Sequence, residues 1–128
     1  MVAPAAPRRR VLVVEDEADI RDIVVGVLLD EGYDVTTAND GAEALTQVGR
    51  FPPNVILLDL WMPDVDGAAF VAAYRQLPGH HAPIIAFTAL PDGAEQAARI
   101  EADVLLAKPF HIHDLLRLVG QYSADPVG

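Results

Sequence analysis

Five side chains that could do chemistry each follow a short apolar stretch of the sequence. They comprise two neighbouring acids, a third acid, a hydroxyl and an amine, namely Glu15, Asp16, Asp59, Thr88 and Lys108. If the apolar stretches are parallel strands of one sheet, their carboxyl ends meet at a single edge and bring these side chains together. Three acids in one cleft repel one another, and a divalent cation would relieve that repulsion.

The donor set favours magnesium. Oxygen ligands without cysteine or a histidine pair suit Mg²⁺ better than zinc. Mg²⁺ keeps several waters and binds phosphate oxygens, so the cluster is suited to phosphoryl transfer. Asp59 is the candidate carboxylate nucleophile. Asp16 is the candidate direct metal ligand, and Glu15 would bind the metal directly or through water.

Two further side chains could bind phosphoryl oxygens. Lys108 would supply a compact positive charge, and Thr88 would supply a hydroxyl donor. We also predict that the Lys108–Pro109 bond is cis. Acids that follow strands often only cap the next helix. For Asp16 taken alone, capping explains its position as well as a role in a phosphoryl site does. The presence of Asp59, Thr88 and Lys108 at matching positions favours a phosphoryl site.

The elements that must position these residues alternate along the chain. We expect strands at 10–14, 33–38, 55–58, 83–87 and 104–107, and helices at 18–30, 40–50, 68–77, 93–101 and 112–121. Apolar strands without polar alternation are typical of a parallel sheet covered on both faces. The pattern predicts an α/β fold, a doubly wound five-stranded parallel sheet with five helices. In the last helix, we expect Ile112, Leu115, Leu116 and Val119 to face inward.

Length and composition narrow the class of protein. A chain of 128 residues predicts one domain, here 10–122, between a disordered tail at 1–9 and a tail at 123–128. The absence of cysteine excludes disulfides and thiolate sites. Nine basic residues against 19 acidic ones argue against direct binding of nucleic acid. Without a signal peptide or an apolar run of about 18 residues, we expect no membrane span and a cytoplasmic location.

Four motifs carry a resemblance to a known family. They are VVEDE at 13–17, LDLWMPDVDG at 58–67, FTA at 87–89 and KPF at 108–110. Each lies at the end of an expected strand, and they occur in this order. Over nearly all of residues 10–121, the chain resembles the receiver domain of bacterial response regulators. The resemblance implies a flavodoxin-like sheet with strand order 2-1-3-4-5.

The resemblance also implies an activity. Asp59 would accept a phosphoryl group from a histidine kinase or a histidine phosphotransfer protein, in a Mg²⁺-dependent reaction. The backbone carbonyl of Trp61 would join Glu15, Asp16 and Asp59 as a metal ligand, and Ala89 would stay small to admit the phosphoryl group. The domain would be a signalling module rather than an enzyme, with only self-phosphorylation and slow self-dephosphorylation. It would bind a downstream protein through its fourth helix, fifth strand and fifth helix.

One position departs from the family pattern. Leu105 stands where the family usually has Tyr or Phe, so we expect the loop after Thr88 and the helix 93–101 to carry the signal. Two other functions stay open. The chain could be a pseudo-receiver that only binds partners, or a Mg²⁺-dependent aspartyl phosphohydrolase. Such hydrolases usually have an acid two residues after the nucleophile, where this chain has Trp61. With no output domain after the last helix, the chain is expected to act alone or to be an excised receiver.

Overall fold

The computed structural model describes residues 9–60, 67–89 and 93–124. Most of the predicted tail at 1–9 and residues 125–128 of the predicted tail at 123–128 lie outside these ranges. In the described part, strands and helices alternate as predicted. The strands are β1 (Arg10–Val14), β2 (Asp34–Ala38), β3 (Val55–Asp59), β4 (Ile84–Thr88) and β5 (Val104–Ala107). The helices are α1 (Ala18–Asp30), α2 (Gly41–Arg50), α3 (Gly67–Gln76), α4 (Gly93–Arg99) and α5 (Ile112–Tyr122).

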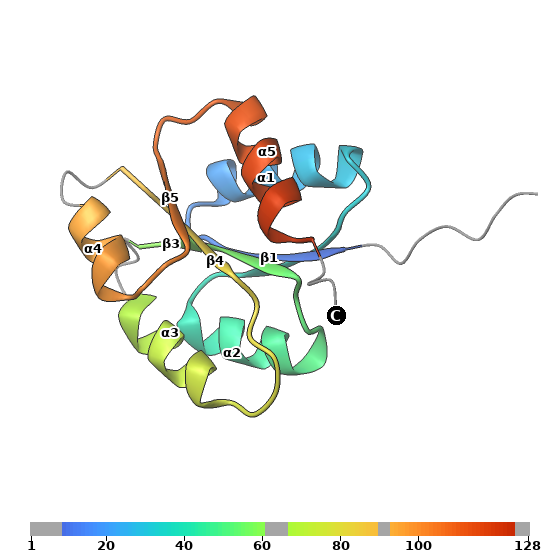
Figure 1. Cartoon of the computed structure of the whole chain (residues 1–128). Helices are drawn as coiled ribbons and strands as arrows, with labels where there is room; N and C mark the ends of the chain where they lie inside the picture. The colour runs from blue at the N-terminus through green and yellow to red at the C-terminus, as the bar shows by residue number, and fades with distance from the viewer. Residues whose placement is uncertain (1–8, 61–66, 90–92, 125–128) are drawn as a thin grey trace, which may run out of the picture.

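The five strands form one parallel sheet in the order β2-β1-β3-β4-β5, which confirms the expected α/β topology. Helices α1 and α5 lie on one face of the sheet, and α2 and α3 lie on the other (Figure 1). No helix in the described ranges is both long enough and apolar enough to cross a bilayer. The order places β1 and β3 side by side, so the acids at their ends are neighbours.

Strand β1 supplies both halves of the core because side chains alternate along a strand. Leu12 and Val14 join the cluster formed with α2 and α3, whereas Val11 and Val13 join the cluster formed with α1 and α5. All four are fully buried. Because β1 is buried on both faces, its carboxyl end is where the chain leaves the core and where its next side chains can reach the edge of the sheet.

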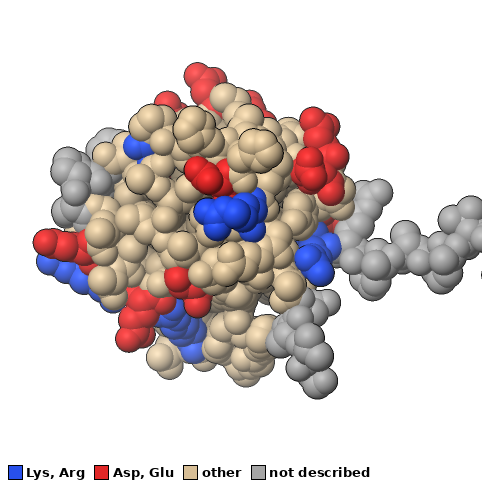
Figure 2. All heavy atoms as spheres, turned by 45° about the horizontal axis from the view of Figure 1, so that its top comes forward, with Lys and Arg blue, Asp and Glu red and all other residues tan. Residues whose placement is uncertain are grey.

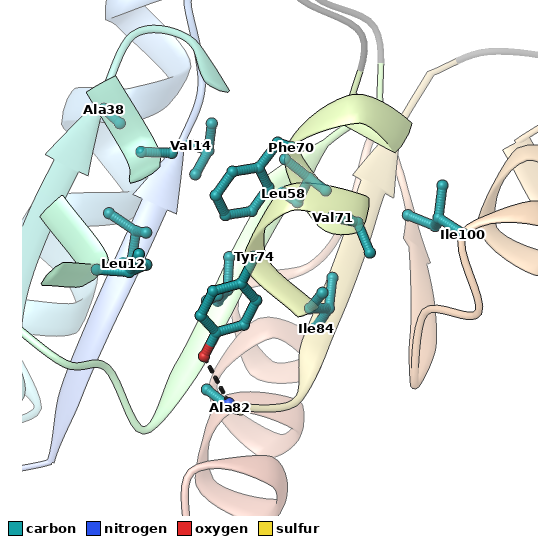
Figure 3. Packing of buried hydrophobic residues seen from close by; sticks show 13 residues of the cluster. Leu12, Val14, Ala38, Leu58, Phe70, Val71, Tyr74, Ala82, Ile84 and Ile100 are labelled. Carbon is teal, nitrogen blue, oxygen red and sulfur yellow. Dashed lines mark hydrogen bonds between the residues drawn. The ribbon is translucent and has the colours of Figure 1, made fainter. Parts of the chain in front are cut away.

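The cluster beneath α3 is built on two aromatic rings (Figure 3). Phe70 and Tyr74 stack with their centroids 5.8 Å apart. The Tyr74 hydroxyl accepts a hydrogen bond of 2.7 Å from the backbone N–H of Ala82. A buried tyrosine needs such a partner for its oxygen. The bond ties α3 to the segment that leads into β4, and so helps to position the strand that carries Thr88.

One expectation about the last helix is wrong. Ile112 is 49% exposed, and Leu118, which was not predicted to face inward, is buried. Ile112 is the first residue of α5 and lines a groove with Ile23 and Pro109, beside the loop that follows β5. The rest of the predicted face is confirmed, because Leu115 and Val119 are buried and Leu116 packs partly buried against the same cluster.

Substitutions at two glycines test where helix α1 runs and where it ends. Gly26 is exposed in α1, and a Cβ added there would meet nothing within 4 Å. We expect Gly26→Ala to raise the free energy of unfolding by about 0.5–1 kcal/mol, because alanine loses less conformational entropy. Gly32→Ala is the matched control. Its φ of +91° is strained for alanine, so this variant should lose about 1 kcal/mol. Urea denaturation of both variants measures the difference, and a loss of stability in Gly26→Ala would contradict the helix.

Candidate functional site

The carboxyl ends of four strands place the predicted site residues at one edge of the sheet. Glu15 follows β1, Asp59 ends β3 and Thr88 ends β4, while Lys108 follows β5. Carboxylate oxygens of Glu15, Asp16 and Asp59 lie within 4.8 Å of one another. The structure therefore brings together the three acids that the sequence analysis singled out.

Lys108 joins two of these acids. Its Nζ lies 3.0 Å from Oε2 of Glu15 and 3.4 Å from Oδ2 of Asp59. The exposed fraction of the side chain is 13% for Lys108, 1% for Glu15 and 6% for Asp59. Buried charges need such partners, because an unpaired ion in a protein interior has lost its hydration without compensation. Nζ also lies 4.7 Å from the centroid of the Phe87 ring, in the range of a cation–π contact.

Glu15 is the most deeply buried of the acids, and its environment alters its titration. The pKa of the Glu15 carboxyl is raised from 4.5 to about 7, chiefly because burial disfavours its charged form; the negative charge of Asp59 adds to this rise and Lys108 opposes it. Its Oε1 accepts a hydrogen bond of 3.1 Å from the backbone N–H of Glu17. Both oxygens of Glu15 are thus engaged by groups of this chain.

Asp16 lies differently from its neighbour. It is exposed, whereas Glu15 is fully buried. The residue that caps α1 is Glu17, and its side chain makes no capping hydrogen bond. The capping alternative for Asp16 is therefore absent from the structure. Its carboxylate stands at the mouth of the cluster, where a solvated ion can approach.

A cavity of about 600 Å³ opens over the acids. The described residues that line it include Asp16, Asp59, Ala89 and Lys108. Ala89 is exposed there, so the wall beside Asp59 is a small side chain. Thr88 is only 2% exposed and is not among the described lining residues. Trp61, the predicted carbonyl ligand, lies outside the described residues.

The chemistry of the donor set fits a hard divalent cation. The three acids offer oxygen atoms at close range, and no histidine or cysteine is among the described residues that line the cavity. Such ligands suit Mg²⁺. The arrangement places a carboxyl group, an ammonium group and a cluster of oxygen donors around one cavity.

Two features of this edge were missed in the sequence. The ring of Phe87 lies against the Lys108 ammonium. The sequence showed Phe87 only as the first residue of the FTA motif, which does not indicate this contact. An apolar groove of about 510 Å³ adjoins the cavity and shares Ile20, Ala89 and Lys108 with it. Its exposed isoleucines, Ile23 and Ile112, read in the sequence as ordinary members of helical apolar patterns.

The sequence matches the family model described as the response regulator receiver domain over residues 11–120. A relative from Porphyridium aerugineum, named "Probable transcriptional regulator ycf27", is 38% identical over 127 residues, which cover 92% of this chain and 52% of the relative. A DNA-binding response regulator of Mycobacterium tuberculosis is 35% identical over 114 residues, covering 88% of this chain and 49% of the relative. The chain thus spans about half the length of these curated relatives.

Solved structures give the same result. The chain is similar to a chemotaxis response regulator of Vibrio cholerae, with 34% sequence identity and a TM-score of 0.80. The likeness covers 90% of this chain and 98% of the other. At this level of identity, both the fold and the family agree with the resemblance seen in the four motifs.

The titration of Glu15 predicts how stability depends on pH when no metal is present. The pKa of Glu15 is raised in the folded state, so its contribution is fully present below about 4.5 and is lost as the pH rises through about 7. We expect the free energy of unfolding in EDTA to fall over this range. The side chain of Glu15→Gln cannot ionise, so the free energy of unfolding of this variant should fall less steeply with pH than that of the parent. Urea denaturation from pH 5 to pH 8 measures both proteins, and parallel profiles would show that Glu15 does not titrate in this way.

Proposed function

Because the chain belongs to the family of response regulator receiver domains, a signalling family of two-component systems, we propose that Asp59 accepts a phosphoryl group from a phosphohistidine donor. The observation that carries the proposal is the position of the Asp59 carboxylate, which lines the open cavity and lies 3.4 Å from Lys108 Nζ. A nucleophile paired with a fixed cation, in a cavity large enough for a phosphoryl group, is suited to this transfer.

In the proposed step, an oxygen of Asp59 forms a bond to phosphorus while the bond from phosphorus to the donor nitrogen breaks. The donor nitrogen keeps that electron pair. Lys108 supplies positive charge to a phosphoryl oxygen, and Thr88 turns its hydroxyl toward another. The protein's contribution is therefore positioning and charge stabilisation, as is usual in phosphoryl transfer.

The family also implies a magnesium ion, and the acids fit it. Asp16, Asp59 and the carbonyl of Trp61 would hold the ion, with Glu15 acting directly or through water. When bound, Mg²⁺ would supply positive charge to the phosphoryl oxygens. Asp16 is the exposed member of the acidic cluster, which supports its role as the entry ligand.

The proposed partners follow from the same chemistry. The donor would be a histidine kinase or a histidine phosphotransfer protein, and the downstream protein would bind α4, β5 and α5. We propose that residues 10–122 form this receiver, that it acts in the cytoplasm, and that it does not itself bind nucleic acid. The net charge of −10 supports the last point. On the face seen in Figure 2, the basic side chains that are drawn lie in small separate groups.

Magnesium should stabilise the unphosphorylated domain. A ligand that binds only the folded state adds about 1.4 kcal/mol to the free energy of unfolding at ten times its Kd. Asp16→Asn should lose this effect, whereas Asp30→Asn, at the far end of α1, should keep it. Thermal or urea denaturation with and without Mg²⁺ measures the change. An equal gain in Asp16→Asn and in the parent would remove Asp16 from the metal site.

Phosphorylation itself is the test of the proposed function. Incubation with Mg²⁺ and acetyl phosphate should add one phosphoryl group, seen by mass spectrometry. The adduct should be labile to base and to hydroxylamine, because an acyl phosphate forms on a carboxylate. Asp59→Asn should abolish it, and Asp22→Asn, an exposed acid of α1, should not. Label on Asp59→Asn would move the acceptor elsewhere. Magnesium binding without any label would identify a pseudo-receiver.

A further inference from the structure

Helix α4 begins on top of the Thr88 methyl group. Gly93 is the first residue of α4 and is buried. A Cβ added to Gly93 would lie 2.6 Å from Cγ2 of Thr88, closer than real Cβ atoms approach a neighbour. The same point would lie 3.9 Å from Cδ2 of Leu105, an ordinary contact distance. The start of the helix therefore approaches Thr88 as closely as only glycine allows.

The contact links the direction of the Thr88 hydroxyl to the position of α4. The Cβ of threonine carries its methyl and its hydroxyl on one tetrahedral atom, so one rotation about χ1 moves both by about 120°. Thr88 is 2% exposed, so a rotated methyl must displace a neighbour or enter space that a neighbour has left. A turn of the hydroxyl toward Asp59 thus changes what lies beneath Gly93.

We propose that Gly93 is the positioning residue that couples the rotamer of Thr88 to helix α4. This inference rests on the proposed phosphorylation of Asp59. When the phosphoryl group draws the hydroxyl of Thr88, the methyl leaves its place under Gly93, and the first turn of α4 moves. Leu105 has no aromatic ring to carry the signal, and its side chain packs beside Gly93. The contact between Gly93 and Thr88 therefore transmits the change to α4.

The other end of α4 is held from α3, which concentrates the movement at Gly93. Arg75 donates hydrogen bonds to the carbonyls of Ile100 (2.6 Å) and Glu101 (2.8 Å), just beyond the end of α4. The turn closes there with a bond of 3.0 Å from the N–H of Ala102 to the carbonyl of Ala97. Figure 1 shows α4 beside α3. A helix of seven residues, anchored at its C-terminal end, responds by moving its first turn.

A double-mutant cycle between Gly93→Ala and Thr88→Ser tests the contact. Serine keeps the hydroxyl and lacks the methyl, so it removes the partner of the added Cβ. The readout is the affinity for beryllofluoride in the presence of Mg²⁺. The Cβ added by Gly93→Ala would displace the Thr88 methyl before beryllofluoride binds. We therefore expect this variant to bind beryllofluoride about fivefold more tightly. In the Thr88→Ser background, the same change should alter the affinity by less than about twofold.

Gly26→Ala is the control, since its added Cβ meets nothing within 4 Å. Equal effects of Gly93→Ala in both backgrounds, or no effect in either, would overturn the coupling. If Gly93→Ala does not fold, hydrogen exchange at saturating beryllofluoride decides the matter. The parent should show a change in the first turn of α4 that Thr88→Ser has lost, and a full response in Thr88→Ser would overturn the proposal.

The two proposals fail in different ways. If beryllofluoride does not bind the parent, or binds Asp59→Asn equally well, Asp59 is not the acceptor and the proposed function fails. If it binds the parent and not Asp59→Asn, while the cycle is additive, the acceptor stands and only the role of Gly93 is lost.

Discussion

One ammonium group between two buried carboxylates is the interaction on which this edge of the sheet depends. Lys108 Nζ contacts Glu15 and Asp59, both nearly inaccessible to water. Removing one partner from such a group leaves an uncompensated buried charge, at a cost of about 3–5 kcal/mol. The parallel order β2-β1-β3-β4-β5 places β1 and β3 side by side and brings the loop after β5 within reach of both. The fold and the charge arrangement therefore require each other.

The same arrangement supports the proposed phosphorylation of Asp59. The acids carry more negative charge than one lysine neutralises, which leaves a role for a divalent cation. A phosphoryl group would add about −1.5 to −2 charge and three acceptor oxygens next to Lys108. The hydroxyl of Thr88 would then reorient, and its methyl lies against the start of α4 at Gly93. A change in charge at Asp59 would thus reach α4 through the contact between Thr88 and Gly93. Helix α4 has only seven residues, so its first turn can shift in response.

Much of this could be predicted from the sequence, and the remainder has physical reasons for being hidden. Uninterrupted apolar runs mark buried parallel strands, so the acids, Thr88 and Lys108 were placed at one edge from the sequence alone. The contrast between buried Glu15 and exposed Asp16 depends on how the chain leaves β1, which neighbours in sequence do not reveal. Ile112 belongs to a regular apolar pattern yet lies beyond the covered sheet. The contact between Gly93 and Thr88 depends on how closely the backbone of α4 approaches a side chain of β4. Composition and periodicity do not reveal such a distance.

A magnesium ion bound as proposed would compete with Lys108 for the same acids. The Mg²⁺ dissociation constant of Lys108→Met, measured by titration at pH 8, above the pKa of Glu15, tests this competition. Removing a positive charge that lies 3.0 Å from Glu15 and 3.4 Å from Asp59 should strengthen the attraction of the acids for a cation. We therefore expect Mg²⁺ to bind Lys108→Met about tenfold more tightly than the parent, a gain of about 1.4 kcal/mol. Weaker or unchanged binding in a folded Lys108→Met protein would contradict it.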